Sequence, residues 1–279
     1  MPDIGYVNGR FSPLSDAVVS VEDRGFQFGD GVYEVIRTYG NRPFQLDAHL
    51  ARLEQSAGAL SLRLPVSKKE CSALIDEAVS RAAYKESKIY IQITRGVAPR
   101  DHQFPSDAVP TLVITVREMR LLPDSLRNNG VEAMTLDDFR WGRCDIKSIN
   151  LLANVLARQQ AKEAGVFEAL FVRHGEVLEG SVSNVFVVAN GQVSTAPEGR
   201  HILSGVTRSL VLNLAREAGL PVYERTSSRD SLYAASEVFL SGTTVEVLPV
   251  VRIDGRLVGA GSPGPITRLL AGRFEKLVA

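Results

Sequence analysis

The sequence predicts an α+β protein of two lobes, a small α/β lobe followed by a larger lobe rich in strands. Helix-like and strand-like periodicities alternate in the first part of the chain, whereas the second part consists mainly of short apolar runs separated by turn dipeptides. Between them, Pro, Asn-Asn and Gly interrupt the periodicity over residues 119–130. We therefore expect a small lobe at residues 1–118, a connector at 119–131 and a large lobe at 132–279.

Composition narrows the class of protein. The chain has 279 residues, 44% of them hydrophobic, which is enough for a substantial core in each lobe. Its 32 basic and 32 acidic residues balance, so no overall field favours nucleic acid or an anionic membrane. Cys71 and Cys144 are far apart and match no metal-ligand spacing, which favours reduced thiols. With no apolar run of about 20 residues and no secretory pattern at its start, the chain is predicted to be cytoplasmic.

The elements of the small lobe are predicted in order from local patterns. Asn8-Gly9 between strand-like residues predicts a type I′ hairpin, and alternation over residues 31–39 predicts a strand. Leucines and alanines at helical spacing then predict a helix from about residue 47 to 60. A second helix is predicted to start at Ser67, whose capping box partner is Glu70. Strands are expected at residues 88–95 and 111–116.

The large lobe is predicted to open with a strand near residues 131–136 and a helix at 149–164. That helix should end at Gly165, which can adopt the left-handed conformation typical of a helix C-terminus. Turn dipeptides then separate a series of strands, and two more helices are expected to start at Thr207 and near Pro265. The dipeptides are His174-Gly175, Asn190-Gly191 and Asp254-Gly255.

Lys147 is the first residue that could carry chemistry. It lies in the apolar stretch "DIKSINLLANVLA", just before the predicted helix at 149–164. A partly desolvated lysine has a lowered pKa and can act as a nucleophile. A solvated surface lysine is the ordinary alternative, and the pattern alone does not exclude it.

Three further segments could bind a ligand, although each also has an ordinary structural interpretation. In "EGSVSNVF", Glu179 precedes the small residues before Asn184, which could simply form a turn. In "ILSGVTRSLVLNLA", Val206 and Thr207 begin a helix whose amides, with Arg208 nearby, could bind a phosphate or carboxylate, or Thr207 could merely cap it. The polar turn "LSGTTVE" could offer more amides to an anion.

The loop "PRDHQFP" contains Arg100 and His102, two positions apart. In an extended loop both side chains would point to the same side, where they could bind a carboxylate. A solvated basic loop is the alternative.

Together these segments resemble the signature of the class IV aminotransferases, which depend on pyridoxal 5'-phosphate. The matching pattern runs from Glu179 through Ser181 and Asn184-Val185-Phe186 to Thr195, and then continues as Leu203-x-Gly205-Val206-x-Arg208. The segments "EDRGFQFGDGVYEVIR", "TRGVAPRDHQFP" and "RWGRCDIKSINLL" are similar to bacterial D-amino-acid transaminases within this family. The resemblance extends from about Tyr6 to the C-terminal helix. It implies fold type IV, in which the larger lobe is a strand-rich pseudo-barrel.

The resemblance also implies roles for individual residues. Lys147 is the expected Schiff-base lysine, and also the base that moves the proton between substrate and cofactor. Glu179 is expected against the pyridine nitrogen of the cofactor, and Arg140 beside the cofactor in a role that spacing does not define. The other expected cofactor-binding residues are Arg52, Ser183, Asn184, Val206, Thr207, Gly242 and Thr243. Gly242 stands where a serine is expected among the phosphate contacts, so one hydroxyl is missing.

Substrate binding is implied for Tyr33, Arg100 and His102, which in similar transaminases hold the substrate carboxylate. In those enzymes the loop residues come from the neighbouring subunit, which implies a homodimer with shared active sites. The implied reaction moves an amino group between a D-amino acid, such as D-alanine, and a 2-oxo acid, such as 2-oxoglutarate. No metal, nucleic acid or membrane is expected to take part.

Three other activities of the same family stay open as alternatives. Branched-chain L-amino-acid transaminases, (R)-amine transaminases and aminodeoxychorismate lyases would share Lys147 and Glu179. The Arg100 and His102 pair favours the D-amino-acid enzyme. Asp101 lies between these two residues and would weaken anion binding if it turned inward.

The remaining histidines and the tryptophan are given no role in the reaction. His49 is predicted on an exposed helix face, and His174 and His201 are predicted in turns. Trp141 could pack under the cofactor region, but the favoured prediction is that it fills the core.

Overall fold

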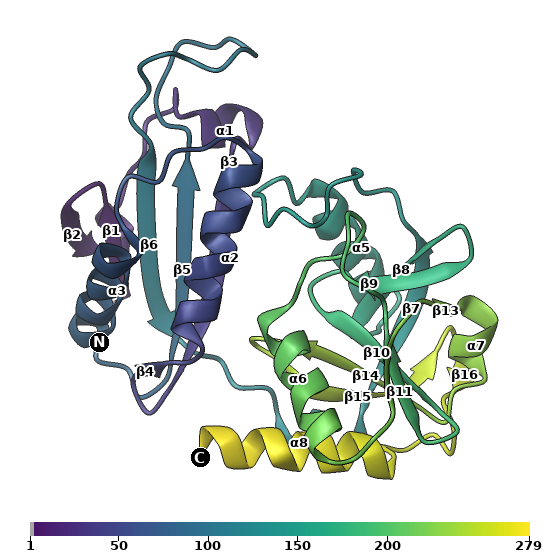
Figure 1. Cartoon of the computed structure of the whole chain (residues 1–279). Coiled ribbons are helices and arrows are strands. Elements are labelled where there is room, and N and C mark those ends of the chain that lie inside the picture. Colours follow the sequence, from purple (N-terminus) through teal and green to yellow (C-terminus); the bar gives the residue numbers. More distant parts are fainter. Residues whose placement is uncertain (1–2) are drawn as a thin grey trace. The chain divides into compact units, whose positions relative to one another are not determined.

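The computed structural model describes residues 3–279, which form two compact units. Of the described residues, unit 1 comprises residues 3–120 and Ile146–Asn150, and unit 2 comprises Leu121–Asp145 and Leu151–Ala279. Each unit contains helices and a single large sheet, so the predicted α+β class is confirmed (Figure 1).

Unit 1 is a six-stranded antiparallel sheet in the order β2-β1-β6-β5-β3-β4. Figure 1 shows the helices α2 and α3 lying along this sheet. The strands are β1 (Ile4–Val7), β2 (Arg10–Pro13), β3 (Gly31–Tyr39), β4 (Arg42–Pro43), β5 (Ser87–Thr94) and β6 (Thr111–Glu118). The helices are η1 (Leu14–Asp16), α1 (Arg24–Phe28), α2 (Leu46–Ala59) and α3 (Lys68–Ala82).

Local sequence signals account for these elements. Asn8 and Gly9 both have positive φ values, 43° and 97°, and they join β1 to β2 as the hairpin pattern predicts. The predicted capping box at the start of α3 is confirmed, because Ser67 and Glu70 bond to each other's main chain. Alternate residues of β3 and β5 face the helices, and the core includes Ile36 and Ile89, both fully buried.

Unit 2 contains a ten-stranded sheet, part of which closes on itself. The strands β10-β14-β15-β7-β8-β9 pair in this order, and β9 pairs back with β10 through Glu179 and Asn184. This closed ring is the expected barrel-like lobe. The strands are β7 (Val131–Asp137), β8 (Glu168–Arg173), β9 (Glu176–Gly180), β10 (Asn184–Ala189), β11 (Gln192–Thr195), β12 (Val222–Glu224), β13 (Ser227–Ser228), β14 (Glu237–Gly242), β15 (Glu246–Ile253) and β16 (Arg256–Leu257).

The helices of unit 2 are α4 (Asp124–Asn129), α5 (Leu152–Glu163), α6 (Val206–Glu217), α7 (Arg229–Tyr233) and α8 (Pro265–Val278). The short helix α4 lies within residues 119–130, where the sequence shows only a break in periodicity. Helix α5 begins three residues later than the predicted start at residue 149, because residues 146–149 bond to the edge of β3 instead. Gly165 follows α5 with a φ of 71°, as predicted.

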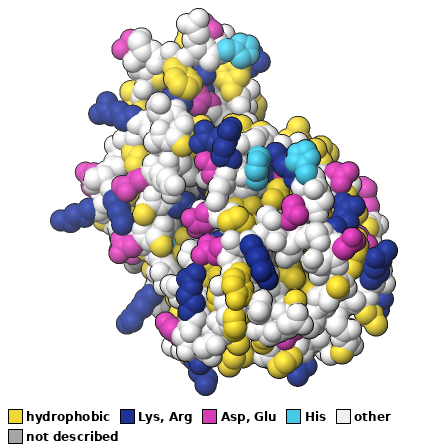
Figure 2. Space-filling model, turned by 45° about the vertical axis from the view of Figure 1, so that its right-hand side comes forward, with side chains coloured by type: hydrophobic (Ala, Val, Ile, Leu, Met, Phe, Trp, Pro, Cys, Tyr) yellow, Lys and Arg dark blue, Asp and Glu magenta, His cyan; other side chains and the backbone are white. Residues whose placement is uncertain are grey.

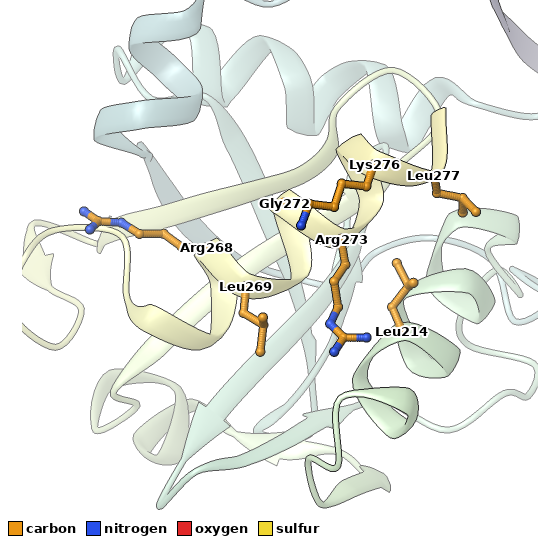
Figure 3. Close-up of a pocket in the computed structure, with 7 residues that line it drawn as sticks. All are labelled: Leu214, Arg268, Leu269, Gly272, Arg273, Lys276 and Leu277. Carbon is orange, nitrogen blue, oxygen red and sulfur yellow. The ribbon is translucent and has the colours of Figure 1, made fainter. Parts of the chain in front are cut away.

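The helices α6 and α8 pack against each other, and a shallow pocket of about 690 Å³ opens beside them. Figure 3 shows Leu277 and Arg273 of α8 near Leu214 of α6. None of the residues that line this pocket belongs to the predicted active site. Within residues 3–279, no helix is both long and apolar enough to cross a bilayer.

The surface carries charges of both signs. On the face shown in Figure 2, basic and acidic side chains are interspersed with apolar ones. This mixture agrees with the balanced charge of the whole chain.

Candidate active site

Lys147 lies in an extended segment attached to the edge of β3 rather than at the start of a helix. Its carbonyl oxygen accepts a hydrogen bond from the Tyr33 amide at 3.0 Å, and its own amide donates to Ser56 Oγ at 3.1 Å. The half-buried ammonium lies 4.4 Å from the centre of the Tyr33 ring. The main chain on both sides of Lys147 is therefore fixed, and its side chain faces the predicted substrate-binding phenol.

Two residues of α2 converge on Glu34, which is fully buried in β3. Arg52 makes two parallel bonds to the Glu34 carboxylate, from Nε at 2.7 Å and from a terminal nitrogen at 2.9 Å. His49 Nδ1 lies 2.8 Å from the same carboxylate. His49 is only 2% exposed, so the prediction that it lies on an exposed helix face is wrong. Its partner Glu34 is distant in the sequence, and this pair was not predicted.

Burial and charge act in opposite directions on this cluster. Burial alone would raise the pKa of Glu34, but Arg52 and His49 outweigh it and lower that pKa to about 2. Burial also lowers the pKa of His49 below its ordinary value, although Glu34 opposes this shift. We therefore take His49 as a neutral imidazole whose Nδ1 proton is donated to an ionised Glu34. The cluster orients Arg52, the predicted phosphate contact.

Arg100 and His102 meet on one aromatic ring. The Arg100 guanidinium lies 4.5 Å from the centre of the Phe28 ring, and the His102 ring lies 5.4 Å from it. The Asp101 carboxylate accepts a bond from the Gln103 amide at 3.2 Å. Asp101 thus bonds within its own loop, and Arg100 and His102 are the side chains that the loop places together.

In unit 2, Glu179 lies at the closure of the barrel and is 5% exposed. Arg140 forms an ion pair with one of its carboxylate oxygens. The other oxygen accepts bonds from the Leu203 amide at 3.0 Å and from the Asn184 side-chain amide at 3.3 Å. The sequence placed Glu179 and Arg140 separately beside the cofactor, and the structure joins them as a pair.

Asp138 holds the other side of Arg140. Its buried carboxylate accepts from Arg140 Nε at 2.9 Å and from Arg173 at 3.1 Å. Burial disfavours the charge on Arg140, but Asp138 and Glu179 outweigh that effect and raise the pKa of the guanidinium. Arg140 is therefore a permanent cation, and it favours the ionised form of Glu179.

The loop between Glu179 and Asn184 is held by Glu168, which was not predicted from the sequence. The buried Glu168 carboxylate accepts bonds from the Val182 amide at 2.7 Å and the Ser183 hydroxyl at 3.0 Å. Burial raises the pKa of Glu168, although these donors oppose the shift. A side chain at Gly180 would clash with the Glu168 carboxylate, so this tight arrangement requires glycine. Ser183, a predicted cofactor-binding residue, thus directs its hydroxyl to Glu168.

Helix α6 begins at Val206, one residue before the predicted start at Thr207. Its N-cap is Gly205, and no side chain among the described residues caps it. The alternative of a Thr-capped helix is thereby excluded. A side chain at Gly205 would clash with Asn184 Oδ1, so glycine allows this close approach of the helix start to Asn184.

Arg208 does not contribute to an anion site at this helix start. Its guanidinium is 1% exposed and donates to Glu224 at 3.0 Å and to the Ala196 carbonyl at 2.8 Å. The sequence suggested it as part of a phosphate site, but it has a structural role instead.

The other predicted anion-binding segment spans the end of β14 and the turn after it, where Gly242 is the last residue of the strand and Thr243 is the first residue of the turn. A Cβ at Gly242 would make only ordinary contacts, the shortest being 3.4 Å to Val245. A serine side chain would therefore fit at position 242, so lack of space does not explain why glycine stands there. The preceding residue, Ser241, has a buried hydroxyl with no partner among the described residues.

Three further expectations concern residues outside these groups. Trp141 is 43% exposed, so the prediction that it fills the core is wrong. It lies in an irregular segment that is held by ion pairs of the nearby residues rather than by apolar packing of the indole. These pairs are Arg140 with Asp138 and Arg143 with Asp145. His174 and His201 lie in turns, as predicted. The buried thiols of Cys71 and Cys144 are both free, and burial raises the pKa of each to about 11.

Comparison with known proteins identifies the family. The family model described as "Amino-transferase class IV" matches residues 31–253 of this chain. The chain belongs to the class IV aminotransferases.

Curated relatives of this class IV aminotransferase match it over nearly its full length. A D-alanine aminotransferase of Bacillus licheniformis is 45% identical over 261 residues, covering 94% of this chain and 92% of the relative. A D-alanine aminotransferase of Staphylococcus haemolyticus is 40% identical over 273 residues, covering 98% of this chain and 97% of the relative.

Solved structures also match this class IV aminotransferase throughout. A branched-chain amino acid aminotransferase of Escherichia coli superposes with a TM-score of 0.93 at 29% identity, covering 100% of this chain and 95% of that one. A second branched-chain amino acid aminotransferase, from T.th. and solved with pyridoxamine 5'-phosphate, gives a TM-score of 0.91 at 30% identity, covering 99% of this chain and 93% of that one. These matches confirm fold type IV.

Proposed function

We propose that this class IV aminotransferase is a D-amino-acid transaminase. It would move the amino group of a D-amino acid, such as D-alanine, to a 2-oxo acid, such as 2-oxoglutarate, in two half-reactions. The observation that carries this proposal is the 40–45% identity to D-alanine aminotransferases over nearly the whole chain. The placement of Arg100 and His102 on one ring supports it, because a carboxylate is common to both substrates.

The residues of unit 2 fit pyridoxal 5'-phosphate as the cofactor. Its pyridine ring withdraws electrons from the substrate most strongly when the ring nitrogen is protonated. The buried Glu179 carboxylate, kept anionic by Arg140, would hold that proton. The amides at the start of α6, at Val206 and Thr207, would receive the phosphate. Around them we place the other predicted contacts of unit 2, namely Ser183, Asn184, Gly242 and Thr243.

Unit 1 would supply the lysine, a phosphate contact and the substrate clamp. Lys147 would attach the cofactor and, once released by the substrate amine, would carry the proton to and from the substrate Cα. Tyr33 lies against Lys147 and would bind the substrate carboxylate together with Arg100 and His102. Arg52, oriented by Glu34, would bind the phosphate.

We further propose that the enzyme is a cytoplasmic homodimer with shared active sites. Large apolar side chains are exposed on both units, which is typical of surfaces covered by a partner. They include Val18, Val21 and Phe26 of unit 1, and Leu152 and Val155 of unit 2, each more than half exposed. Sedimentation equilibrium should give about twice the 30.4 kDa of one chain, whereas a monomer at micromolar concentration would contradict the proposal.

The function is tested by the absorbance spectrum of the purified protein supplied with pyridoxal 5'-phosphate. D-alanine should convert the visible band of the lysine-bound cofactor to the aminated form, and 2-oxoglutarate should restore it. L-leucine should leave the band unchanged. Conversion by L-leucine alone would favour the branched-chain activity for which the two solved structures are named, and would leave Arg100 and His102 without the proposed role.

A further inference from the structure

The loop that carries Arg100 and His102 is anchored through its main chain by Arg24. Two terminal nitrogens of the Arg24 guanidinium donate to consecutive carbonyls, one to Asp101 at 2.5 Å and the other to His102 at 3.5 Å. Arg24 belongs to α1 and is only 3% exposed, whereas the loop residues themselves are exposed. A buried guanidinium therefore fixes the main chain of an otherwise exposed loop.

Asp30 fixes the orientation of this guanidinium. The Asp30 carboxylate accepts from Arg24 Nε at 2.8 Å. It also pairs with Arg95 at 2.8 Å, and Arg95 donates to the carbonyls of Leu60 and Ser61 at the end of α2. The anchor is thus connected to the rigid part of unit 1, and Arg24 cannot follow the loop if the loop moves.

Phe28, at the other end of α1, lies among the same groups. Its ring centre is 4.8 Å from the Arg24 guanidinium, and the Arg100 and His102 side chains lie against it at the distances given above. Arginine above an aromatic face gains cation–π attraction. Arg24 therefore holds the main chain of the loop, while Phe28 contacts the two side chains that project from it.

We propose that Arg24 is a positioning residue for the substrate-carboxylate clamp, and that it acts through Arg100 and His102 without touching the substrate. This inference rests on the proposed function, since the clamp is part of it. The two carbonyls that Arg24 holds belong to Asp101 and His102, so a shift there would displace both clamp side chains at once. Both substrates carry the carboxylate, so both should depend on Arg24.

The test is the Arg24→Lys variant. Lysine keeps the positive charge beside Asp30, but its compact ammonium lacks the fork that reaches two carbonyls together. We expect the KM values for D-alanine and 2-oxoglutarate to rise about tenfold each, because misplacement of binding groups by a fraction of an ångström has effects of this order. The kcat value and the affinity for pyridoxal 5'-phosphate should stay within about twofold of wild type, as expected when uniform substrate binding is lost.

A matched control is Arg37→Lys. Arg37 is also a buried arginine of unit 1, 4% exposed, and it pairs with Glu86 at 2.6 Å. Its guanidinium also lies over the Tyr39 ring, and both of these partners are outside the loop. If Arg37→Lys raises both KM values as much as Arg24→Lys does, the effect is general destabilisation and the proposal is wrong.

A variant cycle tests the route of the effect. In a background that carries both Arg100→Ala and His102→Ala, neither loop side chain of the clamp remains, so adding Arg24→Lys should change the KM values by less than about twofold. If the tenfold effect persists in that background, Arg24 acts in some other way and the proposal is overturned.

Hydrogen exchange provides a readout that needs no catalysis. The peptide amides of residues 97–108 should exchange faster in Arg24→Lys than in wild type, and should be unchanged in Arg37→Lys. Unchanged exchange in this segment would contradict the anchor. If the wild type converts no D-amino acid, the proposed function fails, yet the exchange data still decide whether Arg24 anchors the loop.

Discussion

Replacing Lys147 by alanine should abolish transamination, with a fall in kcat of about a thousandfold or more. Loss of a positioned acid–base group alone has effects of this order, and covalent attachment of the cofactor is lost with it. The fold of unit 1 should survive, because the segment is held through its main chain. The Lys147 amide and carbonyl bond to Ser56 and Tyr33, and alanine keeps both bonds.

The attachment itself can be measured apart from activity. Borohydride reduction of the wild type should fix the cofactor to the peptide that contains Lys147, as seen by mass spectrometry. The Lys147→Ala variant should show no labelled peptide, and Lys147→Arg should behave alike because a guanidinium is a poor nucleophile at neutral pH. Lys162, exposed on α5, offers a matched control, and Lys162→Ala should leave labelling and rate unchanged. Label on another lysine of the wild type would refute the assignment of Lys147.

Local patterns predict much of this fold because their causes are local. The alternation in "GVYEVIRTY" predicts β3 at the residues where it is found, and the Ser67 and Glu70 pair predicts the start of α3. These elements need no information from distant residues. The same holds for the hairpin at Asn8-Gly9.

The errors concern residues whose surroundings are built by distant segments. His49 is buried because Glu34 of β3 lies opposite it. The helical spacing offered a signal, since His49, Arg52 and Ser56 share one face of α2 with the buried Leu53. Polar residues on the same helix face as buried apolar residues indicate that these polar side chains are buried too and need hydrogen-bond partners. The sequence does not say which strand supplies those partners.

Within unit 2, the sequence predicts which individual residues belong to the candidate site, but it does not predict the hydrogen bonds and ion pairs that connect them. Glu179 and Arg140 were placed individually beside a cofactor. Their ion pair depends on the closure of β9 onto β10 and on Asp138, which bonds both the main chain and the side chain of Arg140. Such pairings follow from the three-dimensional arrangement of the barrel, which no local spacing encodes.

The buried cluster of Glu34, His49 and Arg52 should make the cofactor-free protein lose stability in acid, in two steps. His49 has a lowered pKa in the folded protein, so below its ordinary value of 6.5 the unfolded chain binds the proton more readily. Stability therefore falls as the pH drops from about 6.5 towards the lower folded value. Glu34 has a folded pKa of about 2 against an ordinary value of 4.5. Its contribution, about 3 kcal/mol, is present above pH 4.5 and is lost as the pH falls towards 2.

Two substitutions separate these steps in urea unfolding measured between about pH 3 and pH 8. His49→Asn places an amide donor near the Nδ1 position but cannot take up a proton, so the decline that begins below about pH 6.5 should become shallower. Glu34→Gln should destabilise the protein at every pH, because it leaves Arg52 without a buried carboxylate, and should remove part of the decline below about pH 4.5.

Other carboxylates with lowered pKa values, among them Asp138 and Asp145, also lose stabilising interactions in acid. The slope of the wild type alone therefore cannot identify the cluster, whereas the difference between the wild type and His49→Asn can. If the two profiles have the same slope just below pH 6.5, His49 does not change its protonation on unfolding in that range. It would then already be charged in the folded protein, and Glu34 would be neutralising two cations of α2 instead of one. That outcome would also change the electrostatic setting of Lys147, whose charge contributes to the low pKa of Glu34.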